Sequence, residues 1–117
     1  MRRLFGGRTA RKHRATPADD QRVIEQMESL GWNMTEPRLI DNFLYFRSRD
    51  LADQALAACT QAGYEASVGP APDGRSWSVI ARVRRVVTLE AITAQRNELT
   101  GIAEQFRGEY DGWGVGQ

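Results

Sequence analysis

Residues 76–83 read S-W-S-V-I-A-R-V and decide the fold predicted for this chain. In an extended conformation, Trp77, Val79, Ala81 and Val83 fall on one face of the stretch. An apolar residue at every second position is typical of a strand with one buried face. We therefore expect a strand here, in the middle of a sheet.

The residues before this stretch predict the other half of a hairpin. The sequence P-A-P-D-G at residues 70–74 is a turn signal. Proline fixes φ, and Asp-Gly supplies the positive φ that a hairpin turn needs. Before the turn, Tyr64, Ala66 and Val68 alternate as in a second strand. The hairpin is therefore expected to span Tyr64–Val83.

Capping residues and apolar spacing predict three helices. The first opens at Thr16 and Pro17 and ends at Gly31, and the second runs between Ser48 and Gly63. The third follows Thr88, spans Leu89–Phe106 and ends at Gly108. Their apolar stripes are Val23, Ile24, Met27 and Leu30; Leu51, Ala52, Ala55, Leu56 and Cys59; and Leu89, Ile92, Leu99, Ile102, Ala103 and Phe106.

A third strand is predicted at Arg38–Phe46, after the break at Pro37. Its alternation places Phe43 and Tyr45 on the face opposite Leu44 and Phe46. The tail after Gly108 contains the turn dipeptide Asp-Gly at residues 111–112, between Tyr110 and Trp113. We expect this tail to form a tight turn whose two aromatic side chains cover Phe43 and Tyr45.

The order α-β-α-β-β-α predicts an α+β fold of the ferredoxin-like kind. A right-handed crossover between the first two strands leaves a gap, which the third strand fills antiparallel to both. The result is a split β-α-β sandwich with an antiparallel sheet and helices mostly on one face. We expect a basic N-terminal arm at residues 1–15 and a single domain at residues 16–117.

Charge is divided unevenly between these two parts. The first 14 residues contain no acid and six basic residues, which are Arg2, Arg3, Arg8, Arg11, Lys12 and Arg14. The remaining ten basic and fifteen acidic residues give residues 15–117 a net charge of −5. A basic arm suggests a polyanion or an acidic partner, and a solubilising terminus is the alternative interpretation.

The residue types that enzymes use for catalysis are scarce. The single histidine, His13, lies in the arm, and the single cysteine, Cys59, lies on the buried face of a predicted helix. The sequence has no Cys/His cluster for a metal, no phosphate loop and no dinucleotide fingerprint. We expect no enzymatic activity, cofactor or metal site. No apolar run is long enough for a membrane span, and a lone cysteine fits the cytoplasm.

The predicted sheet suggests an alternative function in nucleic-acid binding. Phe43, Tyr45, Ile80 and Arg82 share one face, and RNA-recognition domains stack bases on aromatic side chains of such a sheet. The basic-aromatic motif of those domains is absent from the central strand, so packing beneath the tail is favoured. The alternative site consists of the six basic arm residues together with Phe43 and Tyr45.

Several motifs together resemble the bacterial family called regulator of ribonuclease activity B. They are E-P-R at 36–38 before a strand ending L-Y-F at 44–46, the small-residue helix of residues 51–62 followed by G-Y-E, L-E-A-I at 89–92, and G-E-Y-D-G-W-G at 108–114. The resemblance covers about Ala18 to Val115. It implies a cytoplasmic protein that binds ribonuclease E, through the arginine-rich non-catalytic region of that enzyme, and inhibits cleavage of RNA.

This resemblance implies a contact between opposite charges, because an acidic domain complements an arginine-rich partner. The acidic side chains expected at the contact are Glu25, Glu28, Asp53, Glu65, Glu98 and Glu104. Tyr110 and Trp113 are expected to hold the tail in place or to anchor the contact. The expected partner is therefore a protein, ribonuclease E, and the alternative partner is nucleic acid bound by the arm.

Overall fold

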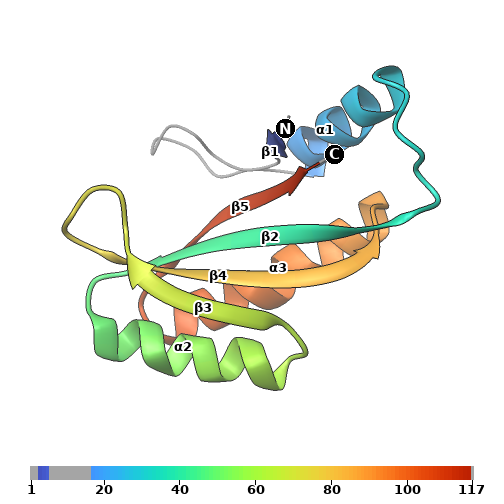
Figure 1. Ribbon diagram of the computed structural model, residues 1–117. Coiled ribbons are helices and arrows are strands. Elements are labelled where there is room, and N and C mark those ends of the chain that lie inside the picture. The colour runs from blue at the N-terminus through green and yellow to red at the C-terminus, as the bar shows by residue number, and fades with distance from the viewer. Residues whose placement is uncertain (1–2, 6–16, 117) are drawn as a thin grey trace.

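A computed structural model describes residues 3–5 and 17–116 of the chain (Figure 1). The elements are β1 (Arg3–Phe5), α1 (Pro17–Ser29), β2 (Pro37–Phe46), α2 (Arg49–Gln61), β3 (Glu65–Pro70), β4 (Trp77–Val86), α3 (Leu89–Gln105) and β5 (Glu109–Gly116). All neighbouring strands are antiparallel, in the order β1-β5-β2-β4-β3. The fold is therefore a mixed α+β fold with an open antiparallel sheet and three helices.

The central hairpin forms as the sequence predicts. Gly74 has φ of 70°, and the carboxylate of Asp73 accepts hydrogen bonds from the backbone N–H groups of Arg75 at 2.8 Å and Ser76 at 3.0 Å. β4 lies between β2 and β3, as expected for the strand that fills the gap. Strand register pairs Leu44 with Val79, and both side chains are fully buried on the face toward the helices.

The helices pack on this one face of the sheet, and their apolar stripes form two buried clusters. The first joins α2 and α3 to β2, β3 and β4, with Ala55 and Leu99 at its centre. The second joins α1 and α3 to β2 and β5, with Met27 and Trp113 among its buried members. Figure 1 shows α2 and α3 side by side under the sheet, with α1 farther along β5. Each fully buried apolar side chain contributes roughly 1.5–3 kcal/mol.

Two leucines that the sequence places in apolar stripes are exposed instead. Leu30 is 41% exposed because α1 ends at Ser29, so its side chain lies beyond the last helical turn. Leu89 is 37% exposed and is the first residue of α3. Two of the predicted N-caps are confirmed, since Ser48 and Thr88 accept hydrogen bonds from the backbone N–H groups of Leu51 and Ala91.

The C-terminal tail is a strand, so the prediction of a tight turn is wrong. β5 pairs with β2, and a register shift between Phe43 and Leu44 inserts one extra residue into β5. As a result Tyr110 lies opposite Leu44 and Trp113 opposite Asn42, both on the face toward the helices. The expectation that Tyr110 and Trp113 cover Phe43 and Tyr45 is therefore also wrong, because the two pairs lie on opposite faces.

Part of the predicted arm is also a strand. β1 pairs antiparallel with β5, with Leu4 opposite Val115, and so extends the sheet beyond β5. The other basic residues of the arm, Arg2, Arg8, Arg11, Lys12 and Arg14, lie outside the described residues, as do His13 and Thr16.

Gly108 provides the first testable prediction. The residue with a positive φ after α3 is Arg107, at 61°, and not Gly108. A glycine is needed at residue 108 for space, because a Cβ there would overlap the ring of Phe46. We expect Gly108→Ala to lower the free energy of unfolding by about 2 kcal/mol. The control is Gly101→Ala in α3, where a Cβ meets open space, and it should raise stability by about 0.5–1 kcal/mol. Urea unfolding measures both, and equal effects would contradict this interpretation of Gly108.

Cys59 provides the second prediction. Its side chain is fully buried in the first cluster, and burial, aided by Glu98, raises the pKa of the thiol to about 11. The thiolate is the reactive form, so we expect no reaction with a colorimetric disulfide reagent at about pH 8 in the native protein. The same protein in denaturant should release one equivalent of product. Rapid labelling of the native protein would contradict the burial.

Candidate functional site

The acidic side chains predicted to contact a partner are exposed, but they do not form one cluster. Five lie on helices: Glu25 and Glu28 on α1, Asp53 on α2, and Glu98 and Glu104 on α3. The sixth, Glu65, begins β3 at the edge of the sheet. The five on helices belong to the layer that covers one face of the sheet, whereas Glu65 lies on the other face, opposite Arg82.

Acidic charge is concentrated in the helical layer and not in the sheet. The three helices contain nine carboxylates and three arginines, a net charge of −6. The strands β2 to β5 contain four of each, a net charge of zero. Because the helices cover one face of the sheet, this face has the negative potential that favours a positively charged partner.

Glu25 and Glu28 are the acidic side chains best placed to meet a partner. They are three residues apart on α1, so they project from one side of the helix. Neither has an ion pair within the part of the chain that the structure describes. By contrast, Asp53 lies 3.7 Å from Arg49, and Glu98 accepts a hydrogen bond from the Tyr64 hydroxyl at 2.8 Å.

Trp113 is fully buried and holds the helical layer to the sheet. Its indole Nε1–H donates to Oδ1 of Asp20 at 2.9 Å, and Asp20 also pairs with Arg96 of α3. A buried carboxylate is tolerated where a cation and a hydrogen-bond donor compensate its desolvation. Asp20 therefore connects α1, α3 and β5, and Trp113 offers no surface to a partner in this conformation.

A second buried polar group lies on the same face of the sheet, around Asn42 of β2. Its Oδ1 accepts from the Tyr110 hydroxyl at 2.8 Å and from Gln95 Nε2 at 3.0 Å, and its Nδ2 donates to the Ala81 carbonyl at 3.1 Å. Burial raises the pKa of Tyr110 far above its usual value, so the hydroxyl stays protonated and donates. Tyr110 thus fixes β5 to β2 and α3.

The sequence analysis did not identify Asn42, Gln95, Arg96 or this role of Asp20. Asp20 lies in the first turn of α1, where the helix dipole already favours an acidic residue, so its position gives no sign of a distant partner. One signal was available, because Asn42 and Gln95 are polar residues at positions where the strand and helix periodicities put the core. A polar residue within a buried stripe indicates a hydrogen-bonded partner elsewhere in the chain.

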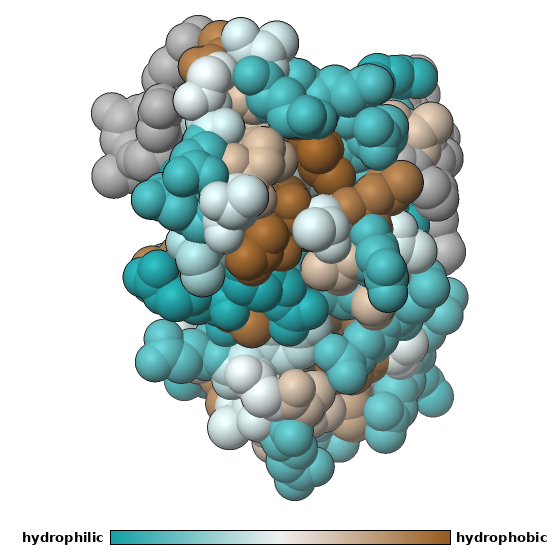
Figure 2. Space-filling view, turned by 90° about the vertical axis from the view of Figure 1, so that its right-hand side faces the viewer, coloured by the Kyte–Doolittle hydropathy of each residue, from teal (hydrophilic) through white to brown (hydrophobic). Residues whose placement is uncertain are grey.

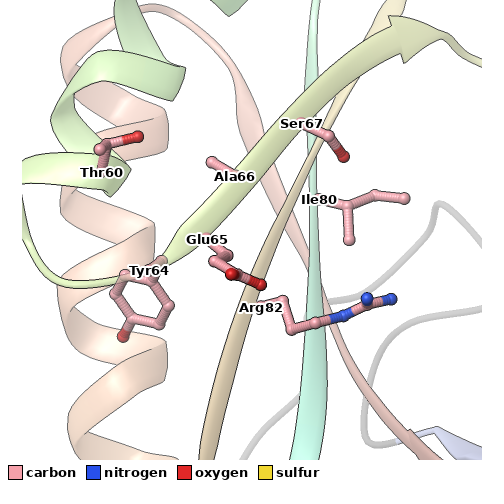
Figure 3. A pocket seen from close by; sticks show the side chains of 7 residues that line it. All are labelled: Thr60, Tyr64, Glu65, Ala66, Ser67, Ile80 and Arg82. Atoms are coloured by element: carbon pink, nitrogen blue, oxygen red, sulfur yellow. The ribbon is translucent and has the colours of Figure 1, made fainter.

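A cleft of about 480 Å³ borders the edge strand β3 (Figure 3). In Figure 3, Thr60 and Tyr64 lie on one side of β3, and Glu65, Ile80 and Arg82 lie on the other. Glu65 is opposite Arg82 in the strand register. Arg82 donates from Nε to Oδ1 of Asp41 at 2.7 Å and from Nη2 to Oδ2 at 3.3 Å, so its charge is already balanced.

The two aromatic residues of the predicted alternative site, Phe43 and Tyr45, lie on one face of the sheet with Ile80 and Arg82, whereas the side chains of its basic arm residues are not described. Phe43 is opposite Ile80, Tyr45 is opposite Ser78, and all share the sheet face that the helices leave open. Phe43 and Tyr45 are half-buried. Arg82, the cation expected beside them, is bound to Asp41, which raises the pKa of the guanidinium through a hydrogen bond.

Apolar side chains reach the surface at one end of the molecule. Figure 2 views the end at which β2 and α3 begin, and brown residues gather in its upper centre with hydrophilic residues around them. Within the part of the chain whose side chains are described, the large apolar residues with substantial exposure are Leu30, Leu39 and Leu89. Leu30 follows α1, Leu39 lies near the start of β2, and Leu89 is the first residue of α3.

The described residues contain no group of three or more histidine, cysteine or acidic side chains arranged to hold a metal ion. Among the helices of residues 17–116, none combines the length and the apolar character that crossing a membrane requires.

Comparison with known proteins identifies the family. The model of the family described as regulator of ribonuclease activity B matches residues 18–115, which is most of the chain. No curated protein matches the sequence. The matched region begins in α1, ends in β5 and contains the acidic helical layer, Asp20 and Trp113. The chain therefore belongs to the regulator of ribonuclease activity B family.

Proposed function

We propose that this protein is a non-enzymatic, cytoplasmic regulator of RNA decay, which acts by binding ribonuclease E and inhibiting its cleavage of RNA. Family membership supports regulation of a ribonuclease. The main support for this mode of binding is the net charge of −6 on the three helices that cover one face of the sheet. An arginine-rich segment of the enzyme is the complementary surface.

The proposed contact centres on the side of α1 that bears Glu25 and Glu28. Both carboxylates are exposed and have no ion pair within the described residues, so a partner arginine replaces only water there. Leu30, which is exposed just beyond α1, adds apolar surface next to this charge. Charge accelerates and orients association, and apolar contact adds affinity.

The fold suits this role as a binding platform. We assign the segment β2-α2-β3-β4-α3-β5 to the ferredoxin-like fold, with the strand order β5-β2-β4-β3 as support. The helices then lie in one layer, and their solvent-facing sides form a continuous surface. Asp53, Glu98 and Glu104 extend the negative charge from α1 across this layer.

The test of the proposed function is capture of the partner from a lysate of the native host. The tagged chain should retain ribonuclease E after nuclease treatment, and moderate salt should weaken the retention because it screens exposed charges. Recovery that vanishes with nuclease would show that RNA forms the bridge. A complex insensitive to salt would contradict the electrostatic contact.

Charge-neutral variants test the position of the contact. Glu25→Gln with Glu28→Gln should raise the Kd for purified ribonuclease E by about two- to thirtyfold, since two exposed ion pairs contribute roughly 0.2–1 kcal/mol each. The matched control is Gln26→Ala, an exposed uncharged position between them on α1. Calorimetry measures both variants. Equal affinities for the double variant and the control would place the contact elsewhere.

A further inference from the structure

The outer edge of β3 has the properties of a site for an added strand. β3 is the last strand of the sheet, and no strand of the described residues pairs with its outer side. Its four middle residues, Ala66–Gly69, carry no charge. Uncharged sheet edges are templates for pairing with another extended chain, and natural proteins usually block them.

The hydrogen-bond pattern shows which backbone groups this edge presents. The N–H of Ala71 donates to the Ser76 carbonyl at 2.9 Å, so residue 71 faces β4. In an antiparallel pair, successive residues alternate between facing the partner strand and facing away. The backbone groups of Ala66 and Val68 therefore point outward, together with the carbonyl of Pro70. Pro70, which has no N–H, occupies an outward position where no bond to β4 is lost.

The cleft beside β3 provides room for the side chains of an added strand. On the open side of the sheet, the added strand would pass Glu65 and Ser67, and on the helix side it would pass the half-buried Ala66 and Val68. Glu65 is exposed, and the nearby cation, Arg82, is already paired with Asp41. Around the cleft, Glu65 and Asp41 lie beside Arg82, and Glu98 and Arg85 flank Tyr64, so three acidic and two basic side chains give this edge a net charge of −1.

We propose that the β3 edge binds an extended, basic peptide segment of the partner by β-strand addition. Main-chain hydrogen bonds to Ala66 and Val68 hold the segment, a basic side chain pairs with Glu65, and the alternate side chains rest on Ala66 and Val68. This inference rests on the proposed function only for the identity of the partner. A second copy of this chain fits less well, because it would bring an edge with the same negative charge against this one.

The test uses the full chain and a synthetic peptide in which arginine alternates with valine, followed by amide NMR. Addition of the peptide should shift the Ala66 and Val68 resonances and slow their hydrogen exchange. A peptide with glutamate in place of arginine should bind about tenfold more weakly. Glu65→Gln should weaken binding of the arginine peptide about threefold.

A proline substitution separates main-chain pairing from side-chain contact. Val68→Pro removes an outward N–H without removing a hydrogen bond to β4. It should weaken binding of the arginine peptide about tenfold. Val68→Thr keeps the N–H and is the matched control. If Val68→Pro does not fold, N-methylation of alternate peptide amides removes the same hydrogen bonds and should have the same effect.

Three outcomes would overturn the proposal. They are the absence of shifts on β3, equal binding of the N-methylated peptide, and a dimeric mass by light scattering with Ala66 and Val68 already protected before the peptide is added. The result is independent of capture of ribonuclease E from the lysate. If the peptide binds at β3 but the lysate yields no ribonuclease E, the proposal of a peptide site at β3 stands and the proposal of ribonuclease E as the partner fails.

Discussion

The structure depends on the buried carboxylate of Asp20, which connects three elements that are far apart in the sequence. It pairs with Arg96 of α3 and accepts a hydrogen bond from the Trp113 indole of β5. Breaking a buried ion pair typically costs 3–5 kcal/mol, because the remaining charge stays desolvated. This contact fixes α1 over the sheet, and α1 carries the carboxylates that we propose as the centre of the partner contact.

Local patterns in the sequence predicted the elements between Pro17 and Gln105 well. Strand alternation placed Leu44 and Val79 in the core, and capping chemistry located the helix starts at Ser48 and Thr88. The tail was misread because Asp-Gly at residues 111–112 has turn chemistry. Its strand depends on a one-residue register shift against β2, which no local pattern reveals.

The candidate site was predictable in composition but not in arrangement. Net charge identified an acidic domain, yet only the fold shows that the helices, which carry the excess, cover one face of a sheet whose strands β2 to β5 are neutral. Trp113 has the residue type of an interface anchor and is instead fully buried. Its partner Asp20 is distant in sequence, and such long-range polar pairs cannot be inferred from periodicity.

The central claim is that the acidic helical layer, and not the open sheet face, contacts the ribonuclease. The most direct measurement is the NMR spectrum of the isotopically labelled full chain during addition of purified ribonuclease E. We expect line broadening at Glu25, Glu28 and their neighbours on α1, together with Ala66 and Val68 if the partner also occupies the β3 edge. Broadening centred on Leu39, Phe43 and Tyr45 of β2, on the sheet face that the helices do not cover, would contradict this contact.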